Sequence, residues 1–266
     1  MLKTLQQKPL FSAILIVSLY ALWFLIPMLF KEAVQHKDMG VGISGALTEW
    51  SAELITASVL AFIISLLGWW KNIGFQKIAK GGVKFLLPIF ILIGLILTLA
   101  AFSDTSHKWF LGFDTPSQLL ELLAVVLLLG FVEEGVFRGV LFYGLSTKLT
   151  PLYAVIISAI TFGLFHFVNI ASGATLLDTS YQALHAMSMG FLYASLRLRI
   201  HAIWPLMIMH GLWDFSLFVL QSTTQTGQAS SGGTASIISG LAISLPSLLY
   251  GSYVYWNWSK KGESLK

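Results

Sequence analysis

Eight long apolar runs constrain this chain more than any other feature of its sequence. They cover roughly residues 9–30, 52–70, 84–102, 117–143, 151–169, 180–197, 202–220 and 235–257. A run of about 20 apolar residues is the length an α-helix needs to cross the hydrocarbon core of a bilayer. Because a spanning segment must satisfy its backbone hydrogen bonds internally, such runs fold as helices. The sequence therefore predicts an all-α fold, a polytopic transmembrane helical bundle of about eight spans.

Composition supports this class of protein and excludes others. The chain is 56% hydrophobic and only 11% charged, whereas soluble domains carry about 25% charged residues. The net charge of +4 is modest, and its lysines and arginines sit in short loops, so nucleic acid is not an expected partner. The 266 residues contain no cysteine, which excludes disulfides, a thiolate nucleophile and a zinc–thiolate site.

The distribution of basic residues predicts the orientation of the bundle. Counted from the first apolar run, alternate loops hold most of the lysines and arginines: Lys71, Lys77, Lys80 and Lys84; Lys148; Arg197 and Arg199. The two ends of the chain share this character. Basic loops prefer the cytoplasmic side of a membrane, so both termini are expected to be cytoplasmic. The short, loop-poor chain is typical of a bacterial protein, and an integral protein of the bacterial cytoplasmic membrane is expected.

Ionisable residues inside the apolar runs divide the chain into three parts. The first three runs and the last have essentially none in their interiors, whereas the four runs between them have seven. We therefore interpret residues 1–116 as a three-span scaffold, residues 117–220 as a four-span catalytic core, and residues 221–266 as an outer loop, a last span and a cytoplasmic tail.

Two adjacent glutamates and an arginine interrupt the fourth apolar run. An ionisable group at the centre of a bilayer costs at least about 2.5–3.5 kcal/mol, so these residues need partners or a cavity. Glu134 and Arg138 are four residues apart and share a helix face, which favours an ion pair that braces the fold. Glu133 points about 100° away from Glu134 and is left without a local counter-charge. It is therefore the candidate for chemistry.

Three further polar residues lie at comparable depths in later runs. His166 is in the fifth run, and His210 and Asp214 share one helix face in the seventh. A carboxylate and two imidazoles that meet in a dry cavity suit hydrolysis, with Glu133 as a general base. His166, His210 and either Asp214 or Glu133 can also supply the three protein ligands of a Zn²⁺ site. The zinc-binding HExxH helix is absent from the sequence.

These residues form three motifs in order. Residues 133–138 read EEGVFR, residues 162–166 read FGLFH, and residues 210–214 read HGLWD. This set resembles the CAAX-protease and bacteriocin-processing family of intramembrane proteases, which includes type II CAAX prenyl endopeptidases and bacterial Abi-type proteins. The resemblance covers residues 117–220. It implies an endopeptidase that cleaves a membrane-associated peptide or protein near the cytoplasmic face of the lipid bilayer.

The resemblance also implies roles for individual residues. Glu133 would activate water together with His166, while His210 and the residue at 214 would stabilise the oxyanion or bind a metal. Many relatives have Asn where this chain has Asp214, and an ionised Asp has no N–H to donate. Asp214 is therefore protonated, or orients His210, or helps bind a cation.

A non-enzymatic function is the alternative prediction. Buried Glu, His and Asp residues also form proton relays in membrane transporters, and a bacteriocin-immunity protein would need only to bind. Paired halves with broken helices are typical of transporters, and no such duplication is visible in this sequence. Processing and immunity are compatible, since a protease can confer immunity by cleavage.

Overall fold

The computed structural model describes residues 2–29, 44–104, 111–224 and 234–262, and within these ranges the chain is helical with no β-strand. The first half supplies α1 (Leu2–Gln7), α2 (Pro9–Leu29), α4 (Ser44–Leu67), η1 (Val83–Phe85) and α5 (Leu87–Phe102). The second half supplies α6 (Pro116–Glu134), η2 (Gly135–Leu141), α7 (Phe142–Ser146), α8 (Pro151–Phe165), η3 (His166–Ser172), α9 (Leu176–Ile200), α10 (Trp204–Thr224) and α11 (Thr234–Ser259). Each of the eight expected runs overlaps one or more of these helices, so the all-α prediction is confirmed.

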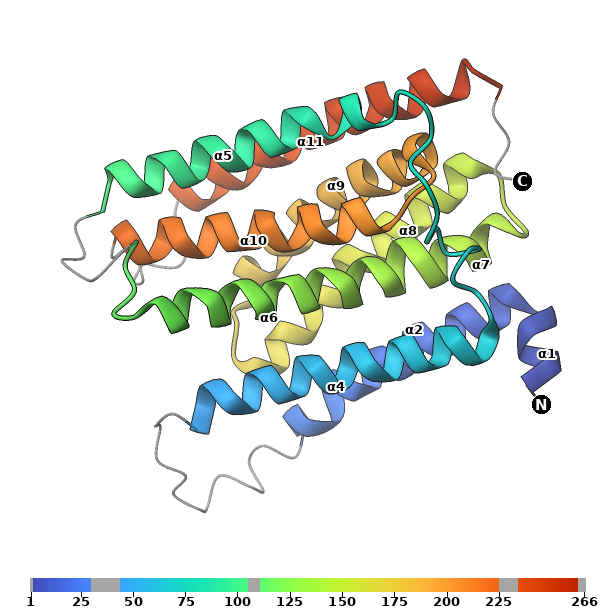
Figure 1. Ribbon diagram of the computed structural model, residues 1–266, viewed down its shortest axis with the longest axis horizontal. Helices are drawn as coiled ribbons and strands as arrows, with labels where there is room; N and C mark the ends of the chain where they lie inside the picture. The colour runs from blue at the N-terminus through green and yellow to red at the C-terminus, as the bar shows by residue number, and fades with distance from the viewer. Residues whose placement is uncertain (1, 30–43, 105–110, 225–233, 263–266) are drawn as a thin grey trace.

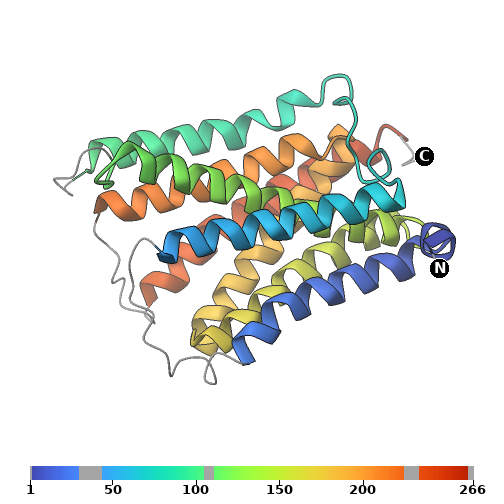
Figure 2. The same ribbon diagram turned by 60° about the horizontal axis from the view of Figure 1, so that its bottom comes forward.

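The long helices run roughly along one axis and form a bundle (Figure 1). Helix α9 packs against both α8 and α11, and α10 packs against both α5 and α6. On the other side of α6 lie α4 and, beside η2 and α7, helix α2. The rotated view in Figure 2 shows α2 and α4 beside this central group. The two ends of the chain lie at the same end of the bundle (Figure 1).

Local sequence determines where several helices begin. Pro116 occupies the first turn of α6, where its missing N–H is not needed. Thr115 precedes it as the N-cap, and its hydroxyl accepts a hydrogen bond from the Gln118 N–H at 3.4 Å. At the start of α9 the Thr175 hydroxyl accepts from the Asp178 N–H at 3.1 Å. These caps fix the residues at which α6 and α9 begin.

Glycines allow α6 and α10 to approach each other closely. A Cβ added to Gly211 in α10 would lie 2.7 Å from the Val126 carbonyl oxygen and 2.9 Å from the Leu127 Cα in α6. A Cβ on Gly130 in α6 would lie 2.9 Å from the Gly211 nitrogen. Small residues at helix crossings permit such backbone contact in membrane bundles. The contact holds His210, which precedes Gly211, against the end of α6.

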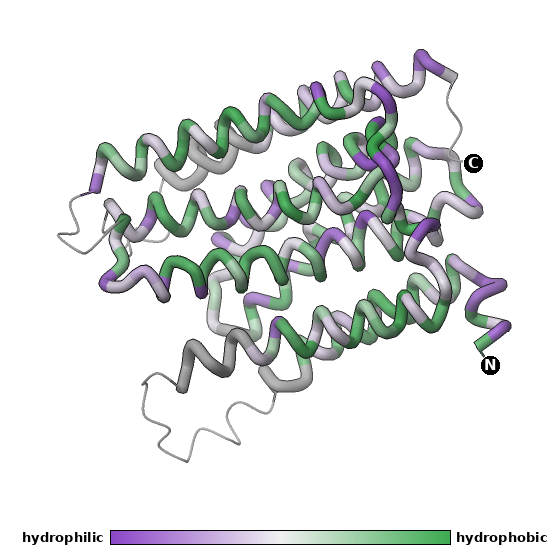
Figure 3. The backbone as a smooth tube through the Cα atoms, viewed as in Figure 1, coloured by the Kyte–Doolittle hydropathy of each residue, from purple (hydrophilic) through white to green (hydrophobic). Residues whose placement is uncertain are grey.

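The outer surface of the bundle is strongly apolar. Six large apolar side chains of the described residues expose between 62% and 88% of their area, namely Phe62, Ile91, Phe102, Leu120, Leu176 and Leu249. Figure 3 shows hydrophobic residues along the lengths of the helices. Apolar surface on this scale fits a lipid environment better than water.

The number of membrane spans is not established. Within the described ranges one helical run, Pro151–Ala171, is long and apolar enough to cross a membrane by itself, with a mean hydropathy of 2.0. The apolar helices Pro9–Leu25, Ser51–Leu67 and Leu87–Phe102 are shorter. Eight spans and cytoplasmic termini therefore stay predictions. Much of the expected outer loop, residues 225–233, lies outside the described residues.

Candidate functional site

The fourth apolar run differs from the uninterrupted α-helix expected over residues 117–143. The chain is α-helical as far as Glu134 and then forms a π-helix over Gly135–Leu141. The Phe137 carbonyl accepts a hydrogen bond from the Phe142 N–H, five residues later. It also accepts one from the Ser158 hydroxyl in α8 at 2.9 Å. A π-helical turn is wider than an α-helical one and often marks a functional site, and here it starts directly after the two glutamates.

Glu134 and Arg138 form the ion pair expected from their spacing. Arg138 Nη1 lies 3.1 Å from Glu134 Oε1, and the two side chains are 1% and 0% exposed. The Arg138 guanidinium also lies over the Phe162 ring, with 4.0 Å between its central carbon and the ring centroid. A desolvated cation over an aromatic face is favourable. Arg138 is therefore held by a carboxylate and a ring from two different helices.

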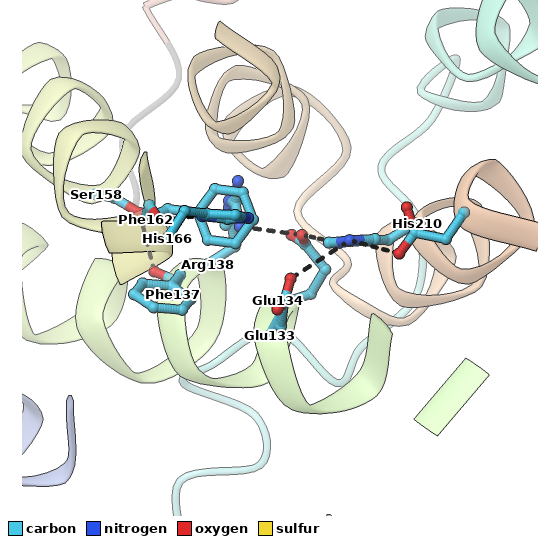
Figure 4. A network of polar contacts seen from close by, with 9 residues as sticks. Glu133, Glu134, Phe137, Arg138, Ser158, Phe162, His166 and His210 are labelled. Atoms are coloured by element: carbon cyan, nitrogen blue, oxygen red, sulfur yellow. Dashed lines mark hydrogen bonds and ion pairs between the residues drawn. The ribbon is translucent and has the colours of Figure 1, made fainter. Parts of the chain in front are cut away.

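His210 lies among three carboxylates (Figure 4). Its Nδ1 donates to Glu134 Oε1 at 2.8 Å. Its Nε2 lies 3.5 Å from Glu133 Oε2 and 3.5 Å from Asp214 Oδ2. A distance of 3.5 Å is long for a direct hydrogen bond, so this nitrogen is close to both carboxylates without being saturated by either. Glu134 thus orients His210 in addition to bracing Arg138, a role that the sequence did not suggest.

His166 occupies the junction between α8 and η3. Its Nδ1 lies 3.0 Å from the Phe162 carbonyl oxygen. A carbonyl can only accept, so Nδ1 carries the proton and the neutral ring keeps its lone pair on Nε2. The Phe162 ring contacts both histidines edge-on, at centroid distances of 5.0 Å to His166 and 6.2 Å to His210.

All six candidate residues line one cavity of about 590 Å³: Glu133, Glu134, Arg138, His166, His210 and Asp214. The structure therefore brings together the residues singled out from three separate runs. Their catalytic roles stay predictions. The cavity is also lined by His185 and by Asn169, whose amide donates to Gln182 Oε1 at 2.8 Å.

Sequence reasoning missed one wall of the cavity, on α9. Five of its residues line the cavity: Gln182, His185, Ala186, Met189 and Tyr193. They lie at positions i, i+3, i+4, i+7 and i+11, which is the pattern of one helix face. The pattern was readable in the sequence, but nothing in the sequence said that this face meets the motif residues.

The candidate metal ligands do not converge in this arrangement. No group of three His, Cys, Asp or Glu side chains within the described ranges is placed to hold a metal ion. Nδ1 of His210 is engaged by Glu134, and Nδ1 of His166 faces a carbonyl. These contacts leave Nε2 of each ring for a ligand, as in histidines that bind zinc, so the zinc site stays a prediction.

Comparison with protein families agrees with the motifs. Residues 115–216 match the family model described as type II CAAX prenyl endopeptidase Rce1-like. The matched segment runs from the N-cap of α6 to the middle of α10, and it contains all three motifs. The resemblance is thus confirmed for this segment, and the family is one of CAAX-type membrane proteases. A comparison with curated proteins finds no match.

Proposed function

We propose that this chain, whose residues 115–216 match a family of membrane proteases, is an intramembrane endopeptidase that hydrolyses a peptide bond near the cytoplasmic membrane face. One observation supports this most directly. A histidine is oriented by one buried carboxylate and presents its other nitrogen to two more, Glu133 and Asp214, at the wall of a cavity. An oriented imidazole beside a carboxylate is the arrangement that general acid–base hydrolysis needs.

Glu133 is the proposed general base. Its carboxylate removes a proton from a water molecule as the water oxygen bonds to the substrate carbonyl carbon. The carbonyl π-electrons move to oxygen, which becomes the oxyanion of a tetrahedral intermediate. When the C–N bond breaks, Glu133 returns the proton to the leaving amine, so the carboxylate is regenerated. His166 shares the positioning of the water, because its Nε2 can accept a hydrogen bond.

His210 is proposed to stabilise the oxyanion. Nδ1 donates to Glu134, so the ring can donate a second proton from Nε2 to the developing negative charge only as an imidazolium, the form that the surrounding carboxylates favour. Asp214 lies close enough to that nitrogen to help orient the ring. Hydrogen-bond donors that are held in place before the reaction stabilise an oxyanion most strongly in a site from which water is excluded.

Cleavage by the purified, reconstituted protein tests the proposal. The family description names a prenyl endopeptidase, so the probes are a farnesylated peptide ending in a CAAX sequence and the same peptide without the lipid. We expect E133Q to lower kcat at least about 100-fold, the lower range of what a general base contributes. The matched control is E121Q, which makes the same change on the same helix at a residue outside the cavity lining. It should keep wild-type activity.

Two results would contradict the proposal. Equal activity of E133Q and E121Q would remove Glu133 as the base. Absence of cleavage of any peptide by the wild type, with peptide binding retained, would favour the immunity or transport alternative.

Peptidase activity measured after removal of metal ions with a chelator tests the predicted zinc site separately. Full activity after chelation would support water activation by Glu133 without a metal. Activity that is lost on chelation and recovered with Zn²⁺ would support ligation by His166, His210 and Asp214 or Glu133.

The proposed location is the bacterial cytoplasmic membrane, with both termini inside. Helix α1 and the C-terminal end of α11 lie at one end of the bundle (Figure 1), which supports placing both termini on the same side of the membrane. The chain has no cysteine, so single cysteines report on sidedness. In intact cells an impermeant maleimide should label T175C and not K148C. Labelling of K148C and not of T175C would show that the topology is the opposite of the proposed one.

A further inference from the structure

Tyr193 presents an unsatisfied hydroxyl group at the candidate site. Its side chain is 2% exposed and lines the cavity that contains Glu133 and His210. Within the part of the chain that the structure describes, its hydroxyl has no hydrogen-bond partner. Buried polar groups nearly always have a partner, so each exception calls for an explanation. The residue belongs to none of the three motifs.

The ring of Tyr193 is held from two sides. The His210 ring packs edge-on against it at a centroid distance of 5.7 Å and an interplanar angle of 69°. The Arg138 guanidinium carbon lies 5.7 Å from the same centroid. Tyr193 therefore adjoins the oriented histidine and the buried ion pair. Its hydroxyl is fixed by packing, as a preorganised donor must be.

The proposed reaction needs a donor at this place. The oxyanion requires N–H or O–H groups, and one of the residues expected to supply them, Asp214, has none when ionised. Arg138 forms an ion pair with Glu134 through Nη1, and the Asn169 amide donates to Gln182. Arg138 Nε is buried without a hydrogen-bond partner among the described residues, so it is the competing donor. The Tyr193 hydroxyl is a neutral, buried donor on a side chain that lines the same cavity.

We propose that the Tyr193 hydroxyl donates a hydrogen bond to the oxyanion of the tetrahedral intermediate and is thus a further catalytic residue. This inference rests on the proposed peptidase function. The hydrogen bond forms as the carbonyl oxygen becomes charged, and the hydroxyl keeps its proton throughout. Tyr193 compensates for the donor that Asp214 lacks.

A purely structural role is the competing explanation. Glu134 Oε2 is also buried without a hydrogen-bond partner among the described residues, and Glu134 acts electrostatically on the Tyr193 phenol. A bond between them would make Tyr193 a support for the ion pair. Loss of such a bond would lower stability, whereas loss of an oxyanion donor lowers only the rate.

The test is Y193F in the reconstituted full-length protein, assayed with the farnesylated and unmodified peptides. Removal of one oxyanion donor typically lowers kcat about 10²–10³-fold, and we expect a loss in this range with KM within twofold and an unchanged Tm. The control is Y153F, which makes the same change at an exposed tyrosine of α8 that lies outside the cavity lining. Its activity should stay within twofold of wild type.

The outcomes separate the two proposals. If wild type cleaves and Y193F keeps kcat within threefold, the Tyr193 assignment is wrong and the peptidase stands. A lower Tm with a proportionate loss of activity overturns the assignment in favour of the structural role. Failure of the wild type to cleave any peptide removes the peptidase function and the assignment with it.

Discussion

Removing the charge of Arg138 should destabilise the protein far more when Glu134 is left in place than when both charges are removed. The two side chains are essentially unexposed and paired at 3.1 Å, so R138M leaves a buried carboxylate without its cation. Breaking a buried pair in this way costs about 3–5 kcal/mol. E134Q leaves the guanidinium unpaired and should cost a similar amount, although a Gln oxygen can still accept from His210.

The double variant R138M/E134Q is the informative one. If the two effects were independent, they would sum to about 6–10 kcal/mol. Replacing both members of a buried pair is often nearly neutral. The main remaining loss is the contact between the guanidinium and Phe162 at 4.0 Å, which is worth about 2 kcal/mol in a desolvated site. We therefore expect a coupling free energy above about 3 kcal/mol.

The free energy of unfolding is measured by titration with SDS, for wild type, both single variants and the double variant. The fluorescence of the nine tryptophans reports on unfolding. K148M, at an exposed lysine in the loop after α7, is the control and should change stability by less than about 0.5 kcal/mol. Additive single effects would refute the reasoning, because they would mean that the two charges do not stabilise each other in the folded protein.

Three further predictions concern positions around the site. G211L should disrupt the α6–α10 contact and abolish activity, because its Cβ would lie 2.7 Å from the Val126 carbonyl oxygen. The control G94L should be tolerated, since nothing lies within 4 Å of its Cβ. Peptidase activity and the free energy of unfolding of both variants test this difference. S158A should lose about 0.5–1.5 kcal/mol of stability with the bond to the π-helix, and equal stability would show that the bond contributes nothing. D214N supplies an N–H donor and should retain activity within threefold, and a 100-fold loss would show that the carboxylate itself is needed.

The sequence by itself predicted where the long helices lie and which residues to propose for the site, but not the π-helix within the fourth apolar run. The positions of the helices follow from local apolar runs. In an apolar environment the backbone N–H and C=O groups must bond to each other, and an α-helix satisfies them within one segment. The Glu134–Arg138 pair also followed from spacing alone, since residues four apart share a helix face. The match over residues 115–216 confirmed the family that the three motifs indicated.

Only the tertiary structure decided how these residues meet. The bond from His210 to Glu134 joins residues 76 positions apart, and it depends on the rotation of α10 and on its close approach to α6 at Gly130 and Gly211. The Phe137 carbonyl in the π-helix also accepts a hydrogen bond from the Ser158 hydroxyl of α8, a contact between residues 21 positions apart. Contacts between helices are set by packing and not by local pattern, which is why Tyr193 and the inward face of α9 were recognised only in the folded bundle.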